Sequence, residues 1–291
     1  MAWNPTQIPD QTGRTFVITG ANGGLGAETT RALAAKGATV LMACRNVAKA
    51  EPVAASIPGD VRVVPLDLAD LSSVRAFAEK TDEFDVLVNN AGLMYIPFTR
   101  TVDGFETQFG VNHLGHFALT GLLLDRIRDR VVTLSSIAHR QTPKLRVDDL
   151  NYDHRRYFRN LAYSQSKLAN LMFARELQRR LAAAGSAVRS YAVHPGVSAT
   201  ELFARTETPL DFVLRPAVRI VGHSPAKAAH STLFAATTPD ADPETYWGPN
   251  RLFGSQGPVA PCPSTKLSKN RELQLALWTE SERMTGVTYR F

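Results

Sequence analysis

Short runs of apolar and β-branched residues alternate with longer segments of helical periodicity along the first two-thirds of the chain. This alternation is typical of repeated strand-helix-strand units, which build a parallel sheet. Strands are predicted at residues 15–19, 39–43, 62–65, 86–89, 131–135 and 188–193. Helices are predicted between them at about residues 25–36, 71–80, 104–127 and 163–184.

Glycine and proline positions support these predictions. Gly37 and Gly185 each follow a predicted helix, and Ser224-Pro225 supplies a capping residue and a first-turn proline before a helix over residues 226–236. Residues 254–263 are rich in Gly and Pro and are predicted to form a loop. A last helix is predicted over about residues 269–285.

The composition indicates a globular protein. The chain has 291 residues, of which 44% are hydrophobic, so a single domain can bury a substantial core. No apolar run reaches about 18 residues, and residues 1–10 lack the pattern of a secretory signal, so we expect a cytoplasmic protein without a membrane span. Two cysteines agree with a reducing compartment. The net charge of +6 comes from Lys and Arg interspersed with acids, which favours a solvated surface over a nucleic-acid partner.

A glycine-rich turn joins the first predicted strand to the first predicted helix, with the sequence Thr19-Gly20-Ala21-Asn22-Gly23-Gly24-Leu25-Gly26. Glycines let the backbone turn tightly and approach a pyrophosphate, whose charge then faces the free amides of a helix N-terminus. The spacing differs from the strict G-x-G-x-x-G pattern, so a turn without a ligand is the alternative. The first strand-to-helix turn is nevertheless where doubly wound sheets bind nucleotides, which favours that function.

Tyr163 and Lys167 stand four residues apart near the start of a predicted helix. Residues at this spacing share one helix face, about 6 Å apart along the axis. An ammonium there would lower the pKa of Tyr163, which could then exchange a proton with a carbonyl oxygen. An incidental pair on a surface helix is the alternative. Other polar residues end predicted strands or interrupt an apolar helix, namely Asn89, Asn90, Ser135, Ser136 and Asn112.

These motifs resemble the short-chain dehydrogenase/reductase family in order and approximate spacing over about residues 14–197. The positions that match are Thr19, Gly20, Gly24, Gly26, Asn89, Asn90, Ala91, Gly92, Asn112, Ser136, Tyr163, Lys167, Pro195 and Gly196. Residues 43–46, 111–117 and 163–170 are more narrowly similar to the retinol dehydrogenase, WW-domain oxidoreductase and protochlorophyllide reductase branch. The resemblance implies an α/β fold, with a Rossmann-type doubly wound parallel sheet of about seven strands in a single domain. It also implies a homodimer or homotetramer.

The resemblance further implies roles for individual residues. Tyr163 would be the acid/base, Lys167 would lower its pKa and hold the nicotinamide ribose, and Asn112 would anchor a water relay to Lys167. Ser136 would hydrogen-bond the substrate oxygen, with Ser135 as the alternative. Cofactor contacts are expected from Gly20, Asn22, Gly23, Gly24, Leu25, Gly26, Arg45, Asp67, Leu68, Asn90, Ala91, Gly92, Tyr163, Lys167, Pro195, Gly196, Val197 and Thr200.

The end of the second strand predicts NADP(H) in preference to NAD(H). A site for NAD(H) commonly has an acidic residue there, whereas this chain has Cys44 followed by Arg45. A guanidinium can bind a 2′-phosphate through two charge-assisted hydrogen bonds, and a solvent-exposed loop cation is the alternative. His113 and His116 have no third ligand at suitable spacing, so no metal is expected.

The segment after Pro195-Gly196 is apolar in part, which favours a lid over about residues 198–223 and a lipophilic substrate. Ordinary packing is the alternative. With a cofactor core over about residues 14–197 and a C-terminal loop and helix over about 254–286, we expect one domain that transfers a hydride between NADP(H) and a lipophilic aldehyde, ketone or secondary alcohol. A non-catalytic NADP(H)-binding sensor or interaction protein is the alternative, although it would not need the proton-transfer residues.

Overall fold

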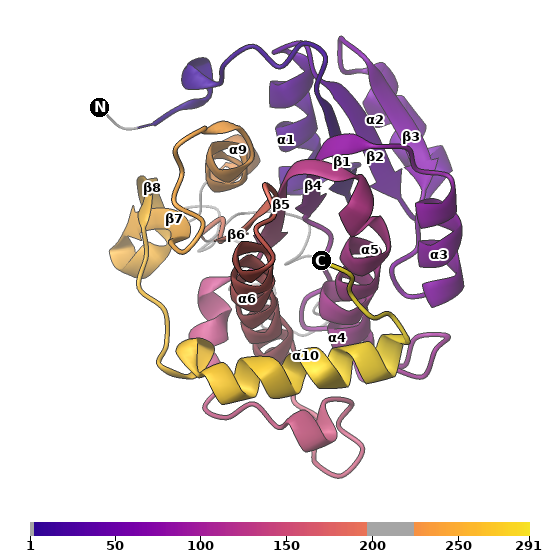
Figure 1. Ribbon diagram of the computed structural model, residues 1–291, viewed down its shortest axis with the longest axis vertical. Coiled ribbons are helices and arrows are strands. Elements are labelled where there is room, and N and C mark those ends of the chain that lie inside the picture. Colours follow the sequence, from indigo (N-terminus) through magenta and orange to yellow (C-terminus); the bar gives the residue numbers. More distant parts are fainter. Residues whose placement is uncertain (1–2, 197–223) are drawn as a thin grey trace, which may run out of the picture.

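The computed structural model describes residues 3–196 and 224–291. Within these ranges the chain forms an eight-stranded sheet with helices on both faces (Figure 1). The strands are β1 (Thr15–Thr19), β2 (Thr39–Cys44), β3 (Val61–Pro65), β4 (Phe84–Asn89), β5 (Ile127–Leu134), β6 (Arg189–Val193), β7 (Tyr246–Arg251) and β8 (Gln256–Pro261). The helices are α1 (Gly24–Ala34), α2 (Val47–Ala55), α3 (Leu71–Glu79), α4 (Thr107–Phe109), α5 (Gly115–Leu123), α6 (Arg159–Ala183), α8 (Pro225–Ala228), α9 (His230–Thr237) and α10 (Arg271–Thr285).

The strand order confirms the expected doubly wound sheet. The order is β3-β2-β1-β4-β5-β6-β7-β8, with parallel pairs throughout except for the antiparallel pair of β7 and β8. From β1 the chain adds β2 and β3 on one side, and then returns to add β4 and the later strands on the other. The carboxyl ends of β1 and β4 therefore lie side by side at the point where the winding reverses, where open α/β sheets bind ligands.

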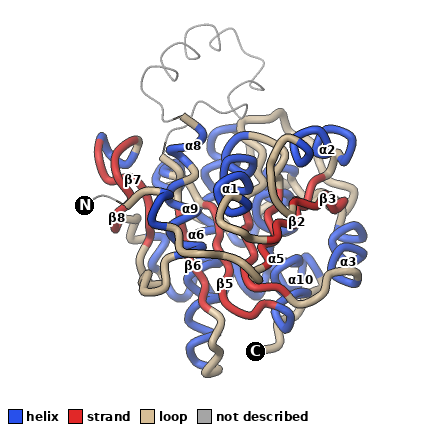
Figure 2. Tube along the Cα trace, turned by 90° about the horizontal axis from the view of Figure 1, so that it is seen from above, coloured by secondary structure: helices blue, strands red, loops and turns tan. Residues whose placement is uncertain are grey.

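Both faces of the sheet are buried. On β1, Phe16 and Ile18 pack into a core cluster with α1, α2 and α9, whereas Val17 packs into the opposite cluster with α3, α5 and α6. Helix α10 lies across α6 and adds Trp278 to the second cluster, stacked on Phe173 with ring centroids 5.8 Å apart. Figure 2 shows the strands running between the helices of the two faces. Because both faces are covered, the strand interiors are apolar and polar side chains gather at the strand ends.

The sheet has one strand more than the seven or so expected, because residues 254–263 are not a simple loop. They contain β8, an edge strand that pairs on one side with β7. Its prolines, Pro258 and Pro261, are tolerated because an edge strand leaves some amide positions unpaired. Sequence patterns also missed β7 and α2, and α2 carries Pro52 inside the helix.

The helix predicted over residues 104–127 is also broken up. It consists of α4, a π-helical turn at Gly110–Leu114, and α5, and the chain then enters β5 at Ile127. Helix α6 begins at Arg159, four residues earlier than predicted. The predicted lid over residues 198–223 lies wholly outside the described residues. Within the described ranges, no helix is long and apolar enough to cross a membrane.

Candidate active site

The carboxyl ends of the parallel strands open into a cavity of about 550 Å³. Most of the site residues expected from the sequence line it: Gly20, Asn22, Gly23, Gly24, Leu25, Arg45, Asp67, Leu68, Asn90, Ala91, Gly92, Ser136, Tyr163, Lys167, Pro195 and Gly196. Gly26 and Asn112 are not part of the lining and lie behind it. Val197 and Thr200 fall outside the described residues.

The glycine-rich turn is packed too closely for a side chain at Gly26. A Cβ atom on Gly26 would lie 2.5 Å from the Gly20 carbonyl oxygen and 2.7 Å from the side-chain nitrogen of Asn90. Asn90 holds the turn by donating that amide to the Thr19 carbonyl oxygen at 2.7 Å. Gly23 precedes α1 in an extended conformation and supplies no side-chain cap. The first amides of α1 therefore have no side-chain cap, an arrangement that suits a phosphate.

Basic side chains line the cavity where β2 ends. Arg45 is exposed and makes no ion pair with another described residue. Lys49, near the start of α2, also lines the cavity, although no sequence pattern singled it out. Cys44 is buried instead of facing the cavity, and burial raises the pKa of its thiol, which stays neutral.

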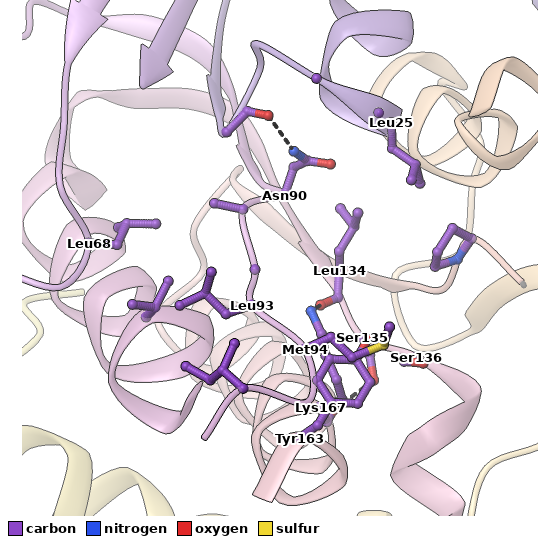
Figure 3. Close-up of a pocket in the computed structure, with 18 of the residues that line it drawn as sticks. Leu25, Leu68, Asn90, Leu93, Met94, Leu134, Ser135, Ser136, Tyr163 and Lys167 are labelled. Carbon is purple, nitrogen blue, oxygen red and sulfur yellow. Dashed lines mark hydrogen bonds between the residues drawn. The ribbon is translucent and has the colours of Figure 1, made fainter. Parts of the chain in front are cut away.

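The two serines after β5 face different partners. Ser135 is buried and donates its hydroxyl to the Lys167 carbonyl oxygen at 2.7 Å. Ser136 hydrogen-bonds the Tyr163 side chain and accepts the Ala138 amide at 3.1 Å. Figure 3 shows Tyr163, Lys167 and the two serines gathered at the end of the cavity near Leu134. Of the two serines, the geometry therefore sets Ser136 beside the tyrosine hydroxyl.

Burial controls the titration of the Tyr163 and Lys167 pair. It raises the pKa of Tyr163 well above its ordinary value, with a smaller opposing effect from the Ser136 hydrogen bond. It lowers the pKa of Lys167 to about 8. The Lys167 Nζ atom lies 5.9 Å from the centroid of the Tyr163 ring and donates to the Leu134 carbonyl oxygen at 3.0 Å. Desolvation of the phenolate is the largest effect on the Tyr163 pKa, so the net shift is upward and does not show the lowering by Lys167 that the sequence predicts.

Asn112 lies in the π-helical turn and connects three segments around the cavity. Its side-chain oxygen accepts the Leu93 amide at 2.7 Å, and its side-chain nitrogen donates to the Leu93 carbonyl and to the Ser166 hydroxyl, each at 2.9 Å. A Cβ on Gly92 would lie 3.3 Å from the Asn112 side-chain oxygen and 3.5 Å from the Lys167 Nζ atom. Asn112 and Lys167 thus converge on Gly92, although the Asn112 amide is already occupied by Leu93 and Ser166.

Tyr95 also lines the cavity beside Tyr163, and the sequence analysis missed it. The two rings meet edge to face with centroids 5.4 Å apart. The Tyr95 backbone has φ 58°, a left-handed conformation that costs energy for a residue with a side chain. Its amide donates to Gln108 Oε1 at 2.8 Å, which holds the strained residue in place. No periodic pattern marks such a position in a sequence.

A parallel doubly wound sheet with a glycine-rich first turn, and with Ser136, Tyr163 and Lys167 at its carboxyl edge, is the arrangement of a nicotinamide-dependent oxidoreductase acting on alcohol or carbonyl groups. Comparison with known proteins makes the class more specific. Residues 14–147 match the family model described as short chain dehydrogenase. Retinol dehydrogenase 13 of Homo sapiens is 40% identical over 94% of this chain and 85% of its own length. Retinol dehydrogenase 12 of Mus musculus is 51% identical over 67% of this chain and 64% of its own length.

The chain therefore belongs to the short-chain dehydrogenase/reductase family, in its retinol dehydrogenase-like branch, which confirms the resemblance found in the sequence. Among solved structures, an uncharacterized protein from Mycobacterium Paratuberculosis is 46% identical with a TM-score of 0.87, and the match covers 100% of both chains. A 3-ketoacyl-(acyl-carrier-protein) reductase from Brucella melitensis complexed with NADH shares the fold, with a TM-score of 0.62 at 23% identity over 78% of this chain and 92% of that one. The described part of the chain holds no group of three or more His, Cys, Asp or Glu side chains arranged for a metal ion.

Proposed function

We propose that this protein transfers a hydride between NADP(H) and a lipophilic aldehyde, ketone or secondary alcohol. The observation that carries the proposal is that one cavity is lined by the glycine-rich turn, by Arg45, and by Tyr163 with its Ser136 and Lys167 neighbours. A cofactor that reaches from the turn to Tyr163 would bring its reactive ring beside the proton-transferring group. A sensor on the same fold has no need of that group, which favours the enzyme.

The residues present fit a dinucleotide. The backbone around Gly20 and Gly26 leaves no room for a Cβ at Gly26, and the uncapped N-terminus of α1 suits the pyrophosphate. Arg45 and Lys49 add positive charge where β2 ends, which suits an adenosine 2′-phosphate. On this proposal Lys167 holds the nicotinamide ribose, because its ammonium has three donors and, among the described residues, donates a hydrogen bond only to the Leu134 carbonyl oxygen.

A bound nicotinamide supplies or accepts the hydride. In the reducing direction Tyr163 donates its proton to the carbonyl oxygen as the carbonyl carbon gains the hydride, and Ser136 holds that oxygen through its hydroxyl. Lys167 is largely protonated at pH 7, because its pKa is lowered only to about 8, so its charge stabilises the phenolate that forms. In the oxidising direction Tyr163 takes the proton back from the alcohol. The high pKa of buried Tyr163 favours the protonated form that reduction needs.

The surroundings of Tyr163 suit an apolar substrate. Met94 and Ala138 pack with Tyr163 and Tyr95, and Ile96 and Ile137 also line the cavity. Lining of this kind stabilises a ligand through burial of apolar surface. The relatives named retinol dehydrogenases are named for an alcohol that is itself lipophilic.

The proposal is tested by following NADPH oxidation with a panel of carbonyl compounds paired by size, such as hexanal against glyceraldehyde and acetophenone against a hydroxylated ketone. We expect turnover with NADPH and a higher kcat/KM for the apolar member of each pair. Saturable NADPH binding without turnover of any carbonyl compound, and without alcohol oxidation by NADP⁺, would favour the sensor instead.

A further inference from the structure

Two buried histidines, His113 and His116, stand three residues apart and face different parts of the molecule. The His113 Nε2 atom hydrogen-bonds the Ser281 hydroxyl of α10 at 2.8 Å. His116 instead contacts two residues that lie behind the lining of the cofactor cavity: its Nδ1 atom lies 3.0 Å from the Asn112 carbonyl oxygen and its Nε2 atom 2.8 Å from the Thr19 hydroxyl. Neither ring lines the cavity itself.

The contacts of His116 fix the position of its proton. A carbonyl oxygen only accepts hydrogen bonds, so the Nδ1 atom must carry the hydrogen that is donated to Asn112. Burial lowers the pKa of His116 to about 4, so the ring is neutral at pH 7 and its Nε2 atom carries a lone pair. The Nε2 atom therefore accepts a hydrogen bond, and the Thr19 hydroxyl donates it.

The other hydrogen bonds of the Thr19 hydroxyl also require it to donate its proton to His116. Its hydroxyl oxygen accepts the amides of Asn90 and Ala91, both at 2.9 Å, which uses its two lone pairs. Two acceptors lie near its proton, the His116 Nε2 atom at 2.8 Å and the Val88 carbonyl oxygen at 3.4 Å from the Thr19 hydroxyl oxygen. The shorter distance favours the hydrogen bond to His116. A directed chain of hydrogen bonds results, from the amides after β4 through Thr19 and His116 to Asn112. Thr19, His116 and Asn112 are at most 1% exposed, so water cannot replace a lost partner.

We propose that His116 is a positioning residue that couples the cofactor-binding turn after β4 to Asn112, through the hydroxyl of Thr19. The inference rests on the proposed function, because it concerns the same cavity. Removing the ring acceptor leaves the buried Thr19 proton without a good partner and the Asn112 carbonyl without this donor, and unpaired buried groups are costly. The Thr19 hydroxyl that accepts the Asn90 and Ala91 amides is then no longer held in one orientation. The position of Asn112 relative to Gly92 and Lys167 is also no longer fixed by His116.

The test compares His116→Phe with His113→Phe, a matched control because His113 is a buried histidine in the adjoining π-helical turn that contacts α10 instead. NADPH affinity is measured by fluorescence titration without substrate, and kcat and KM are measured separately on an active carbonyl compound. We expect His116→Phe to weaken NADPH binding by about tenfold or more and to lower kcat, whereas His113→Phe leaves NADPH affinity near wild type. Equal NADPH affinities in the two variants would overturn the inference.

A second pair of variants keeps the test decisive if His116→Phe does not fold. The amide of His116→Gln can supply an acceptor toward Thr19, whereas the shorter His116→Asn keeps only a donor toward the Asn112 carbonyl. We expect His116→Gln to bind NADPH more tightly than His116→Asn, with a smaller loss of kcat. The same affinity for both would contradict coupling through Thr19.

The chain of contacts also predicts non-additivity. In a Thr19→Val background the hydroxyl is absent, so His116→Gln and His116→Asn should bind NADPH with the same affinity. Independent effects of the two positions would overturn the inference. If the wild type itself neither binds NADPH nor turns over any substrate, the proposed function fails, which is distinct from a wild type that works while the His116 variants behave alike.

Discussion

Arg45 follows the last residue of β2, is exposed at the cavity, and has no ion-pair partner among the described residues. Its neighbour Cys44 is buried and neutral. An acidic side chain at the strand end would repel a 2′-phosphate, whereas a buried thiol does not. The proposed preference for NADP(H) therefore depends on whether the guanidinium contacts that phosphate.

We expect Arg45→Ala to weaken NADPH binding by roughly ten- to a hundredfold, because a hydrogen bond to a charged group contributes about 1.5–3 kcal/mol. NADH binding should change little, and added salt should weaken NADPH binding preferentially. Titration of both cofactors into wild type and variant measures the effect. Arg62→Ala serves as the control, because Arg62 is exposed but paired with Asp60 and does not line the cavity. An unchanged ratio of NADPH to NADH affinity in Arg45→Ala would show that Arg45 does not contact the phosphate.

At the scale of elements, the turn between β1 and α1 offers a matched pair of glycines. A Cβ on Gly26 would collide with the Gly20 carbonyl, whereas a Cβ on Gly23 would meet nothing within 4 Å. Gly26→Ala should therefore lower the free energy of unfolding by about 1–3 kcal/mol, the usual cost of overpacking, while Gly23→Ala should leave it nearly unchanged. Thermal unfolding without nucleotide measures both. Equal stabilities of the two variants would mean that the turn relaxes around the added methyl group.

The glycine-rich turn and the Tyr163-Lys167 face of α6 could be predicted because both are local. A strand followed by glycines, or two residues four apart on a helix, is visible in the sequence itself. The edge strand β8 could not be predicted from the sequence, because its pairing with β7 depends on tertiary structure and its prolines are typical of a loop.

Other features of the site needed three-dimensional contacts. The π-helical turn around Asn112, the strained Tyr95 backbone and the hydrogen bond from Thr19 to His116 each depend on a partner distant in sequence. The direction of the Tyr163 pKa shift also escaped prediction from the sequence, because its largest cause is burial of the ring, which depends on tertiary packing.

At the scale of the whole molecule, buried histidines should make the fold sensitive to acid. Burial lowers the pKa of His116 and His139 to about 4, and of His113 and His194 to about 3. A histidine in the unfolded chain has a pKa near 6.5, so below that value the unfolded state binds more protons than the folded state. The folded state is therefore most stable, with respect to these histidines, above pH 6.5, and its free energy of unfolding falls as the pH is lowered from 6.5 towards 4.

We expect the free energy of unfolding to fall by about 1 kcal/mol for each of these histidines between pH 7 and 5.5. Glu176 stays ionised across this interval, because its hydrogen bonds to Arg179 and Arg180 lower its pKa despite its burial. Burial raises the pKa of Glu106, so protonation of that carboxyl in the folded state would act in the opposite direction and reduce the fall. Denaturant unfolding at a series of pH values measures the slope. Constant stability across the interval would mean that the histidines are not held neutral by burial.

In the proposed function Tyr163 transfers the proton while the cavity holds NADP(H), and this role can be tested with a single variant. It is tested most directly by comparing wild type and Tyr163→Phe in NADPH affinity and in the rate of NADPH oxidation on one carbonyl substrate. The phenylalanine ring keeps the packing against Tyr95, and only the hydroxyl is lost. We predict unchanged NADPH affinity and turnover lower by about a hundred- to ten-thousandfold, the usual contribution of general acid catalysis. Turnover near the wild-type rate in Tyr163→Phe would contradict this account.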